Sequence, residues 1–83
     1  MKNGKGIIKE YYLSGNIKYE GEYLSWNKNG KGREYDIISG KLRYEGEYLN
    51  GNKNGKGKEY DDNGIVEYEG EYLNGEKNGK GKE

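Results

Sequence analysis

Tyrosine and glycine alternate with glutamate in a six-residue segment, Y-E-G-E-Y-L, that occurs three times along the chain. The copies are Tyr19–Leu24, Tyr44–Leu49 and Tyr68–Leu73. Successive side chains of a β-strand point to opposite faces of a sheet, so the segment places two tyrosines and a glycine on one face and two glutamates on the other. The alternation therefore predicts a strand at each copy.

A hairpin turn is predicted directly after each of these strands. Asn50-Gly51 and Asn74-Gly75 are typical two-residue hairpin turns. In the first copy Ser25-Trp26 takes their place. We expect that turn to differ from the other two and Trp26 to lie over its neighbours.

A second strand is predicted to begin within the block K-N-G-K-G, whose Asn-Gly pair is a further turn signal. The block occurs at Lys28–Gly32, Lys53–Gly57 and Lys77–Gly81, and it also opens the chain at Lys2–Gly6. The strand is expected to run from about the G-K-G of the block to Tyr35 or Tyr60. Each unit therefore reads as a β-hairpin.

The period of the repeat is 25 residues from Tyr19 to Tyr44 and 24 residues from Tyr44 to Tyr68. The extra residue falls within residues 35–40, and the first unit has two more around Ile7-Ile8. Such local length changes predict a loop or a bulge at these places. We divide the single array into a partial unit 1–18, units 19–43 and 44–67, and a partial unit 68–83.

Glycines within the predicted strands indicate how the core is built. Gly21, Gly46 and Gly70 stand between two tyrosines. Glycine weakens an isolated strand, so its recurrence suggests that a tyrosine ring from a neighbouring strand lies over the bare backbone. Such a thin core favours a single curved sheet over a sandwich. On the opposite face, Glu45 and Glu47 are expected to meet Lys56 or Lys58 across the hairpin.

Composition limits the class of protein. The chain has 83 residues, enough for one small domain, and only 29% are hydrophobic, which is typical of disordered chains. A net charge of zero and ten tyrosines argue for a folded chain instead. The balanced charge also argues against a nucleic-acid partner.

The residue types that are missing exclude several kinds of chemistry. There is no cysteine or histidine, so disulfides, zinc fingers, thiol nucleophiles and imidazole bases are excluded. No apolar run approaches the roughly 20 residues of a membrane span, and the N-terminus lacks the apolar core of a signal peptide. We expect a cytoplasmic protein.

The repeat resembles the MORN (membrane occupation and recognition nexus) repeat, whose signature is close to Y-x-G-x-[WY]-x-x-G-x-x-x-G-x-G. One copy is filled by Tyr44, Gly46, Tyr48, Gly51, Gly55 and Gly57, and another by Tyr68, Gly70, Tyr72, Gly75, Gly79 and Gly81. In the unit from Tyr19, Trp26 replaces the turn glycine. The resemblance implies an all-β fold: a row of antiparallel hairpins in one elongated, twisted sheet. It also implies a non-catalytic module that binds proteins, self-associates or contacts acidic phospholipids.

Three motifs that suggest other chemistry do not fit their templates. Gly51–Gly57 lacks the spacing and the Ser or Thr of a phosphate-binding loop. Asp61–Gly64 lacks the ligand spacing of a calcium loop. The repeated pairs such as Glu45 and Glu47 have matching surroundings, whereas catalytic carboxylates need unequal ones. We predict no catalytic residue, no metal, no cofactor and no small-molecule substrate.

Basic residues recur at equivalent places and form a candidate stripe for anionic lipid along one edge of the sheet. A stripe of this kind gains ~1 kcal/mol per basic residue near an acidic membrane. The alternative is that these residues only keep the sheet soluble and its edges unpaired. The set is Lys28, Lys31, Arg33, Lys53, Lys56, Lys58, Lys77, Lys80 and Lys82.

The aromatic residues are first of all the predicted core, but any ring left exposed would suit a partner peptide in a groove. The candidate groove residues are Tyr19, Tyr23, Trp26, Tyr44, Tyr48, Tyr68 and Tyr72. No polar capping unit is evident at either end, so we expect a longer array or ends that pair with other copies. The prediction is a non-catalytic scaffold that binds a protein or itself; the alternative is a peripheral membrane adaptor.

Overall fold

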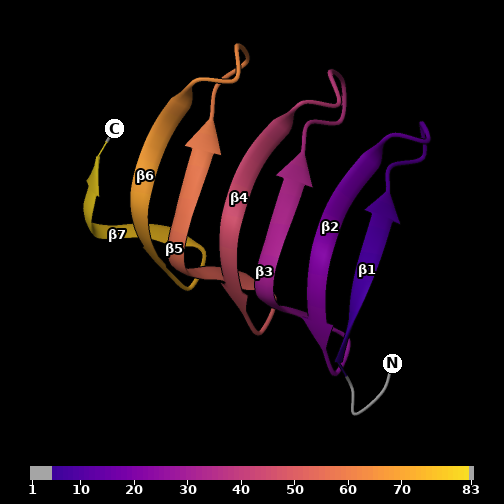
Figure 1. The fold of residues 1–83 in the computed structure, drawn as a ribbon, viewed down its shortest axis with the longest axis horizontal. Helices are drawn as coiled ribbons and strands as arrows, with labels where there is room; N and C mark the ends of the chain where they lie inside the picture. The colour runs from indigo at the N-terminus through magenta and orange to yellow at the C-terminus, as the bar shows by residue number, and fades with distance from the viewer. Residues whose placement is uncertain (1–4, 83) are drawn as a thin grey trace.

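The computed structural model describes the backbone of residues 5–82 and the side chains of residues 5–78. Seven strands form one open antiparallel sheet in which each strand lies beside its neighbours in sequence (Figure 1). The molecule measures 37 × 30 × 13 Å, and its shortest dimension is the thickness of a single layer. The predicted all-β, single-sheet fold is confirmed. The strands are β1 Lys5–Tyr11, β2 Ile17–Leu24, β3 Asn27–Tyr35, β4 Leu42–Leu49, β5 Asn52–Tyr60, β6 Val66–Leu73 and β7 Glu76–Lys82.

The two-residue turns that join β2 to β3, β4 to β5 and β6 to β7 share one backbone conformation. Asn50 and Gly51 have φ values of 52° and 88°, and Ser25 and Trp26 have 49° and 72°. A two-residue turn with two positive φ values matches the twist of the strands on either side. The pairing of β2 with β3 therefore imposes this backbone conformation even on Ser25-Trp26. The expectation of a different turn is wrong. Trp26 is also 80% exposed rather than lying over its neighbours.

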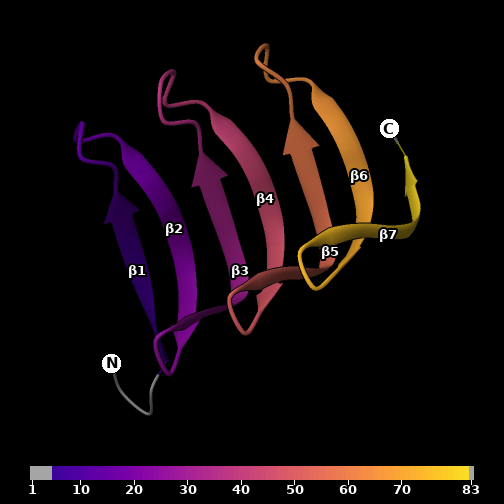
Figure 2. The same cartoon turned by 180° about the vertical axis from the view of Figure 1, so that it is seen from behind.

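The Asn-Gly pairs at residues 29–30, 54–55 and 78–79 lie within strands and do not form turns, and this corrects a second expectation. β3 begins at Asn27 and β5 at Asn52, before the block. β3 pairs with β2 at Gly21↔Gly32 and again at Tyr23↔Lys28, so Glu22 faces residues 29–31. This is a bulge, and Gly30 at its centre has a φ of 99°. The strands β3, β5 and β7 bend sharply near this point, and the whole sheet is bowed (Figures 1 and 2).

The bulge is held by a carboxylate from the preceding strand. Glu22 Oε2 accepts a hydrogen bond from the Lys31 backbone N–H at 2.9 Å. Glu47 Oε1 accepts the equivalent bond from Lys56 at 2.8 Å. These two glutamates therefore have a structural role that the alternation of the sequence did not reveal.

The first unit is in register with the others, which corrects the expected bulge at Ile7-Ile8. Gly6 pairs with Tyr23 and Ile8 with Gly21, as Gly30 pairs with Tyr48 and Gly32 with Gly46 in the next unit. Ile7 and Ile8 are therefore ordinary strand residues at the places of Lys31 and Gly32. The other length change does lie in a loop, between the end of β3 at Tyr35 and the start of β4 at Leu42.

Six tyrosines on one face of the sheet form the core, with exposed fractions between 0% and 8%. Their rings meet edge to face with centroids 5.3–5.6 Å apart. A Cβ atom at Gly32 would lie 2.2 Å from the Tyr19 hydroxyl oxygen, and one at Gly57 would lie 2.4 Å from that of Tyr44. The prediction that tyrosine packs over glycine backbone is confirmed. We call this the tyrosine face.

Candidate interaction surface

The hydroxyls of the six core tyrosines all donate hydrogen bonds within the sheet. Tyr23 donates a 2.5 Å hydrogen bond to Glu10 Oε2, Tyr72 donates one of the same length to Glu59 Oε2, and Tyr48 donates to Glu34. The other three hydroxyls donate to backbone carbonyl oxygens, at 3.3 Å for Tyr19 to Glu22, 3.0 Å for Tyr44 to Glu47 and 2.9 Å for Tyr68 to Glu71. Within the described residues no buried side-chain polar atom lacks a partner.

Three lysines cover the tyrosine face near the two-residue turns. The Lys28 ammonium lies 4.4 Å from the Tyr19 ring centroid and 3.9 Å from Glu34. Lys53 repeats this arrangement over Tyr44 at 4.4 Å, and Lys77 over Tyr68 at 4.8 Å. A cation over an aromatic face is favourable, so these lysines help to hold the core in place.

The six tyrosines of the candidate partner groove are excluded as contacts for a partner, because a buried ring offers no surface to bind. Burial raises the pKa of Tyr19 to about 12, and nearby Glu34 adds to this shift. Burial likewise raises the pKa of Tyr23, Tyr44, Tyr48 and Tyr72. The tyrosines of this face are core residues, and Trp26 is the one member of the candidate set with an exposed ring.

The candidate lysine stripe is divided between the two faces of the sheet. The register pairs Lys28 with Tyr23 but Lys31 with Glu47. Lys53 likewise lies opposite Tyr48 and Lys56 opposite Glu71, so the two lysines of each strand point to opposite faces. The expected stripe along one edge is therefore wrong. Lys28, Lys53 and Lys77 lie on the tyrosine face, whereas Lys31, Arg33, Lys56 and Lys58 line the opposite one. The side chains of Lys80 and Lys82 lie outside the described residues.

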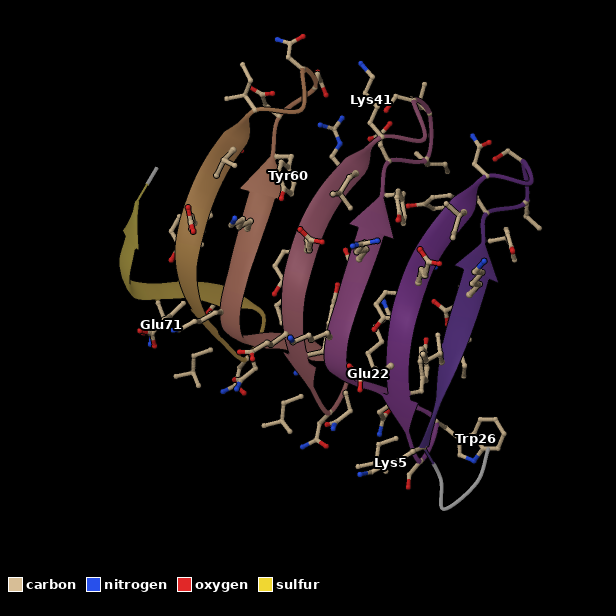
Figure 3. All side chains as sticks on the ribbon, in the orientation of Figure 1. Lys5, Glu22, Trp26, Lys41, Tyr60 and Glu71 are labelled. Atoms are coloured by element: carbon tan, nitrogen blue, oxygen red, sulfur yellow. The ribbon has the colours of Figure 1, made fainter. Side chains whose placement is uncertain are left out.

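The opposite face, here called the charged face, carries acidic and basic side chains that alternate from strand to strand (Figure 3). A first row crosses the sheet as Lys9, Glu20, Arg33, Glu45, Lys58 and Glu69.

Ion pairs link this row. The nitrogen–oxygen distance is 3.7 Å for Lys9–Glu20, 2.8 Å for Arg33–Glu45 and 3.9 Å for Lys58–Glu69. The Arg33 guanidinium holds the pKa of Glu45 below its usual value, which keeps that carboxylate ionised. Glu45 lies opposite Lys58 across the hairpin, as expected, but its ion pair is with Arg33 of β3. These exposed pairs each add at most ~1 kcal/mol, so the row matters more as a charge pattern than for stability.

A second row runs parallel to the first and is less neutralised. It crosses the sheet as Ile7, Glu22, Lys31, Glu47, Lys56 and Glu71. Within residues 5–78, the ammonium groups of Lys31 and Lys56 make no ion pair. Their acidic neighbours Glu22 and Glu47 are turned toward the bulges. The second row therefore presents cations that a partner can engage.

A groove of about 800 Å³ lies between the two rows. Charged side chains form its sides, and backbone forms its floor, because the glycine between the rows has no side chain on either face. The glycines that line it are Gly32, Gly46, Gly57 and Gly70. The groove is thus a trough that runs across the strands and is bordered by alternating charge.

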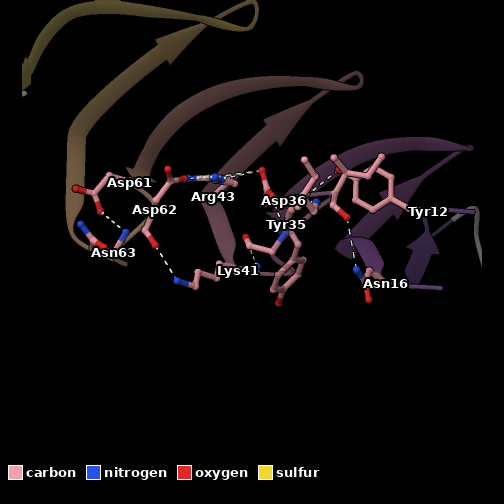
Figure 4. A network of polar contacts seen from close by, with 12 residues as sticks. Tyr12, Asn16, Tyr35, Asp36, Lys41, Arg43, Asp61, Asp62 and Asn63 are labelled. Atoms are coloured by element: carbon pink, nitrogen blue, oxygen red, sulfur yellow. Dashed lines mark hydrogen bonds and ion pairs between the residues drawn. The ribbon is translucent and has the colours of Figure 1, made fainter. Parts of the chain in front are cut away.

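The loops at the upper edge are joined by a separate polar network (Figure 4). Arg43 donates to Asp36 at 3.1 Å and to Asp62 of the next unit, and Lys41 Nζ donates to the Asp62 carbonyl at 2.9 Å. Hydrogen bonds from the Ser39 and Ile38 amides lower the pKa of Asp36 to about 2. The network fixes one loop against the next.

The acidic segment considered for calcium belongs to these loops. The Asp61 carboxylate accepts hydrogen bonds from the backbone N–H groups of Asn63 at 2.9 Å and Ile65 at 3.0 Å. The Asp61 carboxylate therefore stabilises the conformation of the loop through these hydrogen bonds. No group of three acidic, histidine or cysteine side chains within the described residues is arranged to hold a metal ion.

A comparison with known protein families finds one that matches the chain. The family model of the MORN repeat matches residues 44–66 and 68–83. The chain is a MORN-repeat protein. Residues 19–43 lie outside the matched ranges but share the register of the matched MORN units, and Ser25-Trp26 is the point where their turn departs from the signature. MORN repeats are in general non-catalytic modules, and they are often involved in binding or interaction.

Two further comparisons add no relative. No curated protein and no solved structure matches the chain. Within the described residues there is also no helix long and apolar enough to cross a membrane.

Proposed function

We propose that this MORN array is a non-catalytic scaffold that binds a protein partner in the groove of the charged face, with self-association as a second mode of assembly. The observation that carries the proposal is the contrast between the two faces. The tyrosine face is closed by its own rings and lysines, whereas the charged face keeps an open trough of about 800 Å³. Two cations beside the trough, Lys31 and Lys56, make no ion pair with any side chain of residues 5–78.

The chemistry of the groove indicates the kind of partner. Its floor is flat backbone, and its borders change sign from one strand to the next, about every 4.8 Å. A partner with both acidic and basic side chains is complementary to this pattern, and like charges brought together in a wrong register are unfavourable. Lys31 and Lys56 are the residues we expect to meet the partner's carboxylates.

The alternative function, a peripheral membrane adaptor, has less support from the arrangement of charges. On the charged face each basic residue stands beside glutamates, which oppose attraction to an anionic surface. On the tyrosine face, Lys28 and Lys53 already contact rings and carboxylates.

The test compares matched charge reversals in the immobilised full chain. Lys31→Glu with Lys56→Glu reverses the groove, and Lys18→Glu with Lys41→Glu makes the same change in net charge at the upper edge. A partner of the groove should lose at least tenfold in affinity for the first double variant and should bind the second like the wild type. Equal loss with both variants would contradict the proposal.

Vesicle co-sedimentation separates the alternative function. Vesicles with and without phosphoinositide are mixed with the chain at about 0.15 M salt, where long-range attraction is screened. Pelleting that requires the acidic lipid would support the membrane adaptor. Absence of pelleting leaves the protein scaffold as the function to pursue.

A further inference from the structure

We infer that β1 is a homotypic pairing edge, at which two copies of this chain join their β1 strands antiparallel around a two-fold axis at Ile8. The inference deepens the self-association part of the proposed function and rests on it. It is carried by the residues at which β1 departs from β3 and β5.

Ile8 ends the tyrosine-over-glycine packing at this edge. In β3 and β5 the corresponding residues are Gly32 and Gly57, and the rings of Tyr19 and Tyr44 from the preceding strands occupy the space that a Cβ would take. At β1 the Ile8 side chain fills that space and packs against the tyrosine core. A further Y-E-G-E-Y strand therefore cannot add to β1 in the usual way.

The charged face of β1 is apolar where the other strands are polar. Ile7 stands at the place of Lys31 and Lys56 and is 77% exposed. Tyr11 stands at the place of Tyr35 and Tyr60, whose hydroxyls donate to Glu20 at 3.3 Å and Glu45 at 3.2 Å, but Tyr11 is 60% exposed. Lysine at such positions commonly protects an edge strand from pairing, and β1 lacks this protection at Ile7.

The sequence of β1 is suited to pairing with itself. Ile8 is the middle residue of Lys5–Tyr11, so a two-fold axis there overlaps all seven residues. The pairs are then Ile8 with Ile8, Ile7 with Lys9, Gly6 with Glu10 and Lys5 with Tyr11, and no like charges oppose each other. An axis at Ile7 would place Lys5 opposite Lys9, and an axis at Lys9 would place that lysine opposite itself. Charge therefore selects the register centred on Ile8.

A copy joined by β7 to β1 is less suitable. Both strands are of the basic kind that alternates with the glutamate strands, so that contact would bring lysine rows together. Both also run in the same direction through the sheet, so a simple translation would pair them parallel. The occupant of the β1 edge is thus a second copy turned by the two-fold axis.

The first experiment is analytical ultracentrifugation of the full chain over a wide range of concentration. We expect a reversible monomer–dimer equilibrium, because a single edge ladder is a small interface. Ile7→Lys restores the residue of β3 and β5 and would place two lysines opposite each other, so the dissociation constant should rise at least tenfold. Leu73→Lys, at a residue 53% exposed near the other end, is the matched control and should leave the dimer unchanged.

Disulfide trapping reports the register. The chain has no cysteine, so Ile8→Cys introduces a single thiol. Opposite residues of antiparallel strands have Cβ atoms about 4.5–5.5 Å apart, so this variant should form a covalent dimer on mild oxidation. Ile7→Cys, paired with Lys9 rather than with itself, should form it much more slowly, and circular dichroism checks that both variants fold.

A chain that stays monomeric at every concentration would overturn the inference. So would a dimer that tolerates Ile7→Lys or that is trapped equally well by a Leu73→Cys variant. The groove variants Lys31→Glu and Lys56→Glu should leave the dimer intact, so failure of the edge and failure of the groove are told apart.

Discussion

The two faces of this sheet are made by the same strands, yet they use their residues in opposite ways. On the tyrosine face every ring hydroxyl has a partner, and the exposed fraction of the rings is at most 8%. On the charged face the side chains pair only partly and leave an open groove. A one-layer sheet can therefore confine its core to one face and leave the other face for recognition.

The glycines make this division of labour possible. Gly46, for instance, provides space for the Tyr44 ring on one face and a bare floor to the groove on the other. One residue type thus serves stability and surface shape together.

High pH should open the tyrosine face and cause the largest effect. Burial raises the pKa of Tyr19 from its ordinary value of 10.0 to about 12, and the pKa of four other core tyrosines is raised in the same direction. Because the folded state holds these protons more tightly, their contribution is complete below pH 10 and is lost as the pH rises toward 12. Each such tyrosine lowers the free energy of unfolding by about 1.4 kcal/mol per pH unit in that window.

Circular dichroism and tyrosinate absorbance, followed together, provide the check. We expect loss of the fold and ionisation of the core tyrosines to coincide. Ionisation of all ten tyrosines near pH 10 with the fold intact would show that the rings are not closed off.

Gly46→Val should destabilise the fold by about 3 kcal/mol, because the new side chain overfills a closely packed site. A Cβ atom there would lie 2.5 Å from Gly57 Cα and 2.6 Å from the Lys56 carbonyl oxygen. Lys56→Val introduces the same side chain on the charged face and should change stability by less than about 0.5 kcal/mol. Urea unfolding of both variants measures the difference, and equal losses would contradict the packing of tyrosine over glycine.

Tyr48→Phe should lower the free energy of unfolding by about 2 kcal/mol, because the buried Tyr48 hydroxyl donates to the charged carboxylate of Glu34. Tyr60→Phe removes a comparable bond to Glu45 on the charged face, 3.2 Å long and more open to water. That loss should be about 0.5 kcal/mol. Thermal unfolding compares the two, and a larger loss at Tyr60 would reverse the assignment of closed and open faces.

Trp26→Gly should give the smallest effect and the opposite sign, stabilising the fold by about 1 kcal/mol. Trp26 has a φ of 72°, a left-handed conformation that costs a non-glycine residue about 1–2 kcal/mol, and its exposed ring contributes little packing. The converse change, Gly51→Trp, should destabilise the equivalent turn by a similar amount. Melting temperatures that move together in the two variants would contradict this explanation.

The alternation in Y-E-G-E-Y-L was enough to predict the strands, the two faces and the packing of tyrosine over glycine. It was not enough to find the bulge, because Asn29-Gly30 reads as a turn as readily as Asn50-Gly51 does. The choice is made by contacts distant in sequence: the Gly51 N–H donates to the Lys28 carbonyl at 2.9 Å, and Glu22 holds Lys31.

The same ambiguity misplaced the candidate site. A turn at Asn29-Gly30 would interrupt the alternation between Lys28 and Lys31, so the sequence does not show that these two lysines lie on opposite faces. The sequence also does not identify Glu10, Glu34 and Glu59 as acceptors, although a glutamate before tyrosine recurs at the end of β1, β3 and β5. Their role depends on a hydroxyl reaching across strands, which a single strand's pattern does not contain.

The sheet's connectivity has a mechanical consequence. Each strand pairs only with its neighbours in sequence, and no strand bridges distant units (Figure 1). A force that draws the first and last strands apart therefore loads the successive ladders of hydrogen bonds in series, and the weakest ladder opens first. The molecule would lengthen stepwise, hairpin by hairpin, and would act as a yielding tether between whatever is attached to its two ends.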